Sequence, residues 1–220
     1  MKLQSMVKSI AAVAIATAFA GPALADTVKL TNYAFTPAKS IQTSGPSYNG
    51  GAGEFVGTLN GNSFATFCTD LAQSFSFNTT YTDYSVVDGV LAWGAAKSLS
   101  MDKAISYMLA AGGPTNANNS AAYQAMIWEV LYQTSGTFSF TSGTFKASST
   151  NAAAQTALNG INWGAIATQA VTYSVDQLYS PRHQDFLVYA PVPEPESYAM
   201  MLAGLGVMGA IARRRTRAAA

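Results

Sequence analysis

The sequence is poor in the side chains that carry most metal-binding and nucleophilic chemistry. Its 220 residues include a single cysteine, Cys68, and a single histidine, His183. One cysteine excludes an intramolecular disulfide framework. Together the two residues are also too few nitrogen and sulfur ligands for an ordinary zinc site. We therefore expect a fold that depends on no disulfide, metal or cofactor.

Charge is scarce as well, at 10% of all residues. Half of the twelve basic residues lie in the two terminal tails. This leaves residues 26–190 with six basic and nine acidic residues, a formal charge of −3. Nothing in this region resembles the basic patch of a nucleic-acid-binding protein, so nucleic acid is not an expected partner. The remaining composition, rich in Ser, Thr, Asn, Gly and aromatic residues, is common in exported β-rich proteins.

The first 25 residues have the pattern of a secretion signal. Lys2 and Lys8 give the first residues a positive charge. An apolar run over residues 10–20 comes next, and the small-x-small triplet Ala23-Leu24-Ala25 follows. The run is short for a bilayer span, whereas the triplet stands where a signal peptidase would cut. We predict a signal peptide over residues 1–25.

The C-terminal tail has three parts in a fixed order. The first part is Pro193, Glu194 and Pro195. This segment should be stiff and extended, because proline restricts its own backbone and that of the residue before it. An uncharged apolar segment over residues 197–212 follows, somewhat shorter than the roughly 20 residues that a membrane helix prefers. The chain closes with the basic cluster expected on the cytoplasmic side of a membrane: Arg213, Arg214, Arg215 and Arg217.

This tail, over residues 191–220, closely resembles the sorting signal of the PEP-CTERM proteins of Gram-negative bacteria. The resemblance implies that an exosortase recognises the Pro-Glu-Pro segment and that the tail is processed at the inner membrane. The apolar segment would then be a transient transmembrane helix. The same resemblance implies a protein of the cell envelope, the outer surface or the extracellular matrix of a biofilm.

Residues 26–190 are enough for one domain with its own core. We predict a polar loop over residues 43–53 and a hairpin turn at Asn60-Gly61. Strands are expected over 27–35, 54–59, 63–70, 73–77, 81–87, 171–175 and 185–189, and a further hairpin over 137–145. Helices are expected over 101–111, 121–132, 151–158 and 161–169. This order predicts an α+β domain, mostly antiparallel β, with a helical insert at about 90–132.

Gln124 occupies an unexpected position in the predicted helix over residues 121–132. Counting by three and four residues from Gln124 leads to Ile127, Trp128 and Leu131, so the glutamine shares the apolar face. A buried primary amide without partners costs about 1–3 kcal/mol. Some group should therefore satisfy this amide or react with it.

Cys68 is the second anomaly, at the end of a predicted strand. An inert buried thiol, an intermolecular bridge and a reactive group are all consistent with a lone cysteine. The oxidising route of export disfavours a free thiol. A cysteine thiolate can attack a glutamine carboxamide and expel ammonia, which leaves an internal thioester. Such a bond between Cys68 and Gln124 would remove both anomalies at once.

The two segments resemble the thioester domains of bacterial surface adhesins, which share an aromatic-Cys-x-acid segment and a Gln-x-x-Ile-Trp segment. The matching residues are Phe67, Cys68 and Asp70 in the first segment and Gln124, Ile127 and Trp128 in the second. The chain departs from the family at Thr69 and Tyr123. The resemblance implies a Cys68–Gln124 cross-link, with the other four matching residues in supporting roles.

The predicted function is covalent attachment of an exported protein to an amine-bearing surface or matrix molecule. Because the bond is spent once, the protein is not expected to be an enzyme. One alternative is a non-covalent structural or carbohydrate-binding matrix protein with an inert Cys68. Another is a hydrolase that pairs Cys68 with His183, oriented by Asp185 or Asp176, although neither flank carries a protease signature.

Overall fold

The computed structural model describes residues 25–134, 137–192, 200, 202–205 and 207–208. The predicted signal peptide, the Pro-Glu-Pro segment and the arginine cluster lie outside these residues, as does most of the predicted apolar helix. Within the described residues, no helix is both long and apolar enough to cross a membrane.

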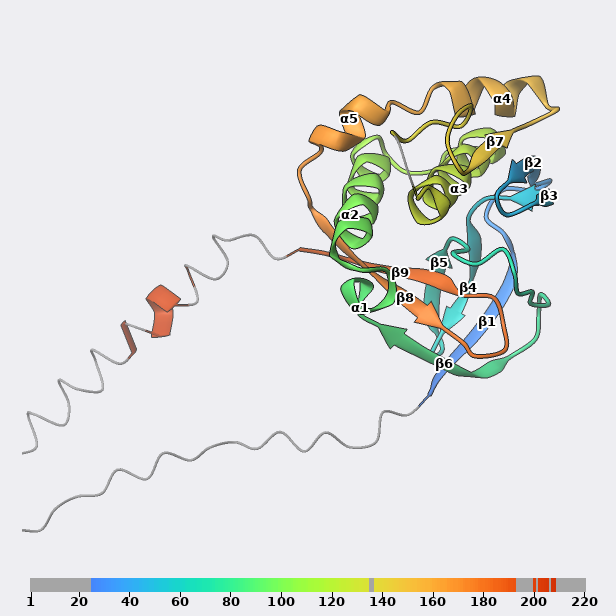
Figure 1. Ribbon diagram of the computed structural model, residues 1–220. Helices are drawn as coiled ribbons and strands as arrows, with labels where there is room; N and C mark the ends of the chain where they lie inside the picture. The colour runs from blue at the N-terminus through green and yellow to red at the C-terminus, as the bar shows by residue number, and fades with distance from the viewer. Residues whose placement is uncertain (1–24, 135–136, 193–199, 201, 206, 209–220) are drawn as a thin grey trace, which may run out of the picture.

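The prediction of a mixed, mostly antiparallel α+β fold is confirmed (Figure 1). The larger sheet has the strand order β5-β4-β1-β6-β8-β9, and every neighbouring pair is antiparallel. Its strands are β1 (Asp26–Tyr33), β4 (Phe55–Leu59), β5 (Asn62–Thr66), β6 (Tyr81–Val87), β8 (Tyr173–Tyr179) and β9 (Phe186–Pro191). A smaller sheet has the order β3-β2-β7, formed by β2 (Lys39–Ser44), β3 (Tyr48–Ala52) and β7 (Lys146–Ser148).

The larger sheet almost closes on itself where the chain leaves β5. Cys68 and Phe186 form an isolated antiparallel bridge between the segment after β5 and the start of β9. The main-chain N–H of Leu187 donates to the carbonyl of Phe67 at 3.0 Å, and that of Thr69 donates to Asp185 at 2.9 Å. This closure brings residues 67–69 beside residues 185–187, although they are far apart in sequence.

The helices lie above the larger sheet in Figure 1, apart from the first one, which lies lower, beside β8. They are α1 (Gly89–Trp93), α2 (Ala95–Ala110), α3 (Ala117–Tyr132), α4 (Ala152–Asn159) and α5 (Trp163–Thr168). The central helix α3 packs against α2 and α4 and against all three strands of the smaller sheet. Every residue from 120 to 131 is buried. A helix enclosed on all sides has no solvent face on which to place its polar residues.

Helix α3 begins earlier than its sequence suggested, at Ala117. The side chain of Asn116 accepts hydrogen bonds from the N–H groups of Asn118 and Asn119. The side chain of Asn119 in turn accepts one from the N–H of Asn116, at 3.0 Å. This reciprocal capping box satisfies donors that the first turn would otherwise leave unpaired.

The strands predicted over 27–35, 54–59, 63–70, 81–87 and 185–189 correspond to β1, β4, β5, β6 and β9, and the predicted turn at Asn60-Gly61 is also present, whereas three segments were predicted wrongly. Asn60 and Gly61 both have positive φ, 53° and 81°, as a two-residue hairpin turn requires. The segment expected to be a loop, 43–53, instead contains most of the β2–β3 hairpin. The segment 73–77 is irregular, because Phe75 and Phe77 pack into an aromatic cluster with Phe55 and Tyr33 rather than along a strand. The described part of the predicted hairpin at 137–145 contains no strand.

Glu129 shows the consequence of enclosing α3. Its side chain is 0% exposed, although glutamate side chains are almost always in contact with water. Oε1 accepts hydrogen bonds from the N–H of Ser139 at 2.7 Å and from Nε2 of Gln133 at 3.2 Å. Oε2 has no hydrogen-bond partner within the described chain. Burial raises the pKa of Glu129 to about 7.

This carboxyl group should make stability depend on pH. Between its ordinary pKa near 4.5 and about 7, the folded state binds more protons than the unfolded state. The free energy of unfolding should therefore fall as pH rises through this range, by about 3 kcal/mol. Urea titrations at pH 4.5 and 7.5 should show this fall in the parent and a smaller one in Glu129→Gln. Asp185, whose pKa burial raises to about 6, should contribute the slope that remains.

An unchanged pH slope in Glu129→Gln would contradict the assignment of this titration to Glu129. The matched control is Asp70→Asn, which changes a carboxyl group that is only half-buried. It should keep the Glu129-dependent slope.

Candidate functional site

Cys68 lies where the larger sheet closes, beside helix α3. Its side chain is 1% exposed and forms part of the wall of a pocket of about 250 Å³. Of the described residues that line this pocket, none is Lys, Arg, Asp or Glu. Aromatic rings and carboxamides make up most of the wall: Tyr33, Tyr48, Phe55, Phe75, Phe77, Trp128, Gln73, Gln124 and Gln184.

Gln124 meets Cys68, but through the main chain of the cysteine. The N–H of Cys68 donates to Oε1 of Gln124 at 2.9 Å, and Nε2 of Gln124 donates to the carbonyl of Cys68 at 2.8 Å. The carboxamide is 0% exposed and both of its polar atoms are paired. Its place on an apolar helix face is thereby explained without a covalent bond. The cross-link between Gln124 and the sulfur stays a prediction.

A second carboxamide, that of Gln184, lies on the thiol itself. Its Nε2 is 2.6 Å from Sγ of Cys68 and 3.0 Å from the carbonyl oxygen of Asp70. The thiol donates to the same Asp70 carbonyl at 2.8 Å. The main chain of Gln184 is held as well, because its carbonyl accepts a 2.7 Å hydrogen bond from the hydroxyl of Tyr84. The sequence pattern indicated Gln124 and gave no signal that Gln184 would contact Cys68.

The surroundings of Cys68 keep its thiol protonated at neutral pH. Burial raises the pKa of Cys68 to about 12, even though the indole of Trp128 and the main chain of Asp70 act to lower it. The N–H of Trp128 thus lies close to the thiol. It nevertheless makes no hydrogen bond of standard geometry with any described residue. This environment differs from the electropositive sites that activate catalytic cysteines as free thiolates.

The predicted supporting residues surround this site. Phe67 and Ile127 are fully buried in the same hydrophobic core as Cys68. Trp128 forms part of the pocket wall. Asp70 acts chiefly through its main chain, since its carboxylate accepts a local hydrogen bond from the N–H of Ala72 at 2.7 Å.

His183 belongs to a different cluster. Its Nδ1 lies 3.1 Å from Oδ2 of Asp83, and its ring packs on Tyr81 with centroids 4.2 Å apart. Burial acts to raise the pKa of Asp83, but hydrogen bonds from Ser180 and Arg182 outweigh it and hold that pKa below its usual value. His183 does not line the Cys68 pocket.

The acids considered as orienting groups for a hydrolase are engaged elsewhere. Asp176 accepts from the N–H of Gly89 at 3.1 Å, and Asp185 accepts from the N–H of Ser180 at 2.7 Å. The Cys68–His183 pair required by a hydrolase is therefore not assembled. In the part of the chain that the structure describes, no three His, Cys, Asp or Glu residues are grouped to hold a metal ion.

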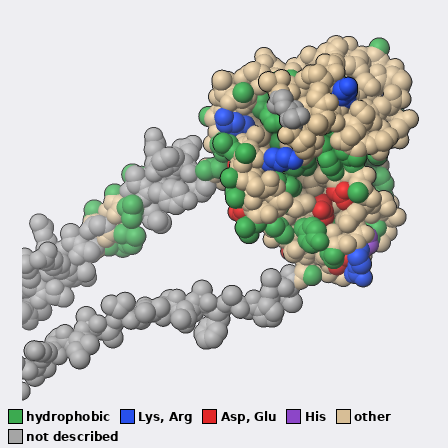
Figure 2. All heavy atoms as spheres, viewed as in Figure 1, with side chains coloured by type: hydrophobic (Ala, Val, Ile, Leu, Met, Phe, Trp, Pro, Cys, Tyr) green, Lys and Arg blue, Asp and Glu red, His purple; other side chains and the backbone are tan. Residues whose placement is uncertain are grey.

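The surface around these features carries little charge. On the face shown in Figure 2, charged side chains are few among uncharged atoms, and basic, acidic and histidine atoms meet at the lower right. Any recognition by this face would therefore depend mainly on shape, hydrogen bonds and apolar contact.

Comparison with protein families identifies the tail. The model described as the PEP-CTERM protein-sorting motif matches residues 191–215, in agreement with the resemblance seen in the sequence. No curated protein and no solved structure matches the chain. The motif implies export, recognition by an exosortase, and a place in the cell envelope or outside the cell in a Gram-negative bacterium. The chain thus carries the sorting signal of an exported PEP-CTERM protein.

Proposed function

We propose that the domain forms an internal thioester between Cys68 and a glutamine side chain, and that this bond attaches the exported protein to an amine-bearing surface or matrix molecule. The observation that carries the proposal is the carboxamide of Gln184 in close contact with the thiol. The contact lies inside a pocket whose described lining is uncharged.

The proposed bond requires only the two side chains. Sγ of Cys68 attacks the carboxamide carbon, so that a carbon–sulfur bond forms and the carbon–nitrogen bond breaks. The nitrogen leaves as ammonia and takes the thiol proton with it. Because Cys68 is almost fully buried, water would reach the thioester poorly and hydrolysis would be slow.

Geometry favours Gln184 over Gln124 as the acyl donor. The leaving nitrogen of Gln184 already lies on the sulfur. Gln124 would first have to give up two hydrogen bonds to the main chain of Cys68, each worth about 0.5–1.5 kcal/mol. We therefore propose that Gln184 supplies the acyl group and that Gln124 holds the Cys68 main chain in place.

The bond would be spent in a single attachment. An amine nitrogen on the partner attacks the acyl carbon, a carbon–nitrogen bond forms, and the carbon–sulfur bond breaks. The proton from nitrogen passes to sulfur, which holds it firmly because the pKa of Cys68 is raised to about 12. The products are a stable amide and a free thiol. Export to the envelope by the PEP-CTERM tail would bring the domain to such partners.

One observation favours the non-covalent alternative. The carboxamide of Gln124 is fully hydrogen-bonded without reaction, as in an ordinary core. A structural or carbohydrate-binding matrix protein with an inert Cys68 would need no more than this. The chemical state of Cys68 separates the two functions.

The thioester should be visible in the intact mass of the purified mature protein. We expect a mass lower than the sequence mass by one ammonia, and a gain of one methylamine after treatment with that amine. Cys68→Ser should abolish both effects. A full sequence mass together with complete alkylation of Cys68 after unfolding would refute the proposal.

Matched glutamine variants should identify the acyl donor. Gln184→Met should remove the mass deficit, because no leaving carboxamide remains at the sulfur. Gln124→Met should keep the deficit but lower the free energy of unfolding by about 1–3 kcal/mol, because it leaves the main chain of Cys68 unpaired. Intact mass and urea denaturation measure the two effects. Loss of the deficit in Gln124→Met alone would make Gln124 the donor.

A further inference from the structure

Two buried polar atoms in the Cys68 pocket lack partners, and their chemistry is complementary. Oε1 of Gln73 is a hydrogen-bond acceptor and the indole N–H of Trp128 is a donor, and neither is satisfied by any described residue. Both residues line the pocket that contains Cys68 and Gln184. Buried polar atoms are rarely left unpaired, since each costs about 1–3 kcal/mol. The pair thus suits a reacting species that brings its own acceptor and donor.

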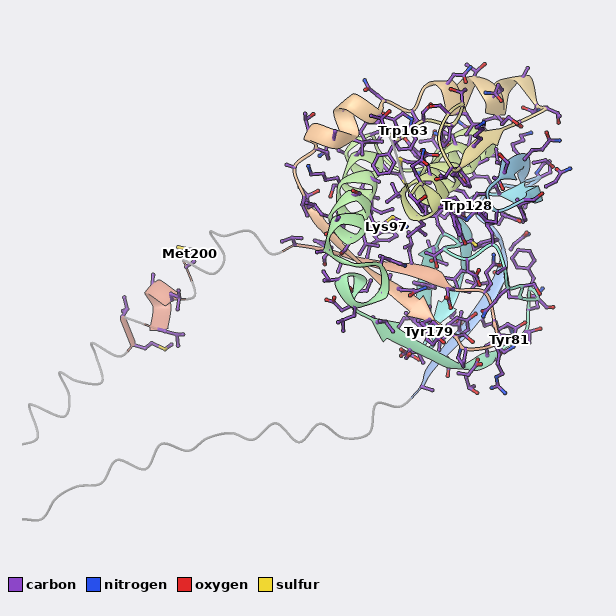
Figure 3. The ribbon with its side chains drawn as sticks, in the orientation of Figure 1. Tyr81, Lys97, Trp128, Trp163, Tyr179 and Met200 are labelled. Atoms are coloured by element: carbon purple, nitrogen blue, oxygen red, sulfur yellow. The ribbon has the colours of Figure 1, made fainter. Side chains whose placement is uncertain are left out.

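The donor is fixed close to the reacting sulfur. Trp128 is 2% exposed, and its ring packs edge-on against Tyr48 with centroids 5.3 Å apart. Figure 3 shows it on α3, on the side toward the smaller sheet. Its indole is close enough to Cys68 to influence the pKa of the thiol. A negative charge that develops on an acyl oxygen beside the sulfur would therefore lie near this N–H.

The acceptor comes from a separate part of the chain. Gln73 belongs to the irregular segment between β5 and β6, which also contributes Phe75 and Phe77 to the pocket. The two tyrosine hydroxyls of the pocket, those of Tyr33 and Tyr48, both donate to the carbonyl of Gly51. The protons of both hydroxyls are therefore engaged, whereas Oε1 of Gln73 is an acceptor without a partner among the described residues.

We propose that Gln73 and Trp128 receive a primary amine as it attacks the acyl carbon: Gln73 accepts a hydrogen bond from the amine N–H, and Trp128 donates one to the developing oxyanion. This inference rests on the proposed thioester. Both residues would then act directly in the attachment step. The site would recognise a nucleophile partly by its N–H group.

The step balances without a further reagent. The amine enters as the free base, because the uncharged pocket disfavours an ammonium ion. Its nitrogen forms a bond to the acyl carbon, and the carbonyl oxygen becomes the oxyanion that Trp128 stabilises. Collapse of this intermediate breaks the carbon–sulfur bond, and the extra proton on nitrogen passes to sulfur. Gln73 is an amide and cannot take that proton, so its role is to orient the nitrogen.

The test compares two nucleophiles of similar size, ethylamine and ethanethiol, on the mature protein. Ethylamine attacks with N–H groups, whereas the thiolate of ethanethiol has none. Each nucleophile is used in excess, and the rate is read from intact mass as the gain of one ethylamine or one ethanethiol. Gln73→Leu should slow the reaction with ethylamine about tenfold and leave that with ethanethiol unchanged. Trp128→Phe should slow both about a hundredfold, because both pass through an oxyanion.

The controls are Gln42→Leu, at an exposed site on β2, and Trp163→Phe. Trp163 lies on α5 against Phe138 and Phe140, away from Trp128 in Figure 3. Both variants should react at the parent rates. Thermal unfolding of each variant reports whether the fold is retained.

The possible outcomes test the thioester, the role of Gln73 and the role of Trp128 separately. A parent protein without the mass deficit refutes the thioester itself. If the deficit is present and Gln73→Leu reacts with ethylamine at the parent rate, the role of Gln73 is overturned. If Trp128→Phe folds, forms the bond and reacts at the parent rates, the role of Trp128 is overturned. Equal slowing of both nucleophiles in Gln73→Leu would also overturn the N–H recognition.

Discussion

The pairing between the carboxamide of Gln124 and the main chain of Cys68 joins the two halves of this domain. It connects the most enclosed helix, α3, to the point where the larger sheet closes. Main-chain groups just past the end of β5 would otherwise need partners at this junction, because buried N–H and C=O groups are seldom left unpaired. The side chain of one glutamine satisfies both groups and sets the position of the sulfur.

The same closure determines what lies against that sulfur. The segment before β9 returns beside the segment after β5, and Gln184 is thereby placed on the thiol. Two glutamines thus meet one cysteine, one at its main chain and one at its side chain. The pocket that opens onto them has a wall of aromatic rings, amides and hydroxyls, and no charged group among its described lining residues. Such a wall would suit the proposed thioester, which must be kept from water until a neutral nucleophile arrives.

Several features of the fold could be predicted because the interactions that produce them are local. The Asn60-Gly61 turn depends on φ values that these two residues adopt readily. Helix α3 followed from an unbroken run without Gly or Pro, although its start depended on a capping box that begins at Asn116. The β2–β3 hairpin was missed because Gly50 and Gly51 weaken the strand signal. The segment 73–77 was misassigned because its aromatic residues alternate as in a strand but pack into a cluster.

The sequence by itself determined the PEP-CTERM sorting motif, the mixed fold class, and the two anomalies, Cys68 and Gln124, whose residue types and spacing directed attention to one site. Only the tertiary structure decided which atoms meet there. Gln184 lies 116 positions after Cys68, and its approach to the sulfur depends on the antiparallel closure of the sheet. The burial of Glu129 likewise depends on neighbours that enclose α3 on every side. Long-range packing creates these contacts, and no local pattern of residues encodes them.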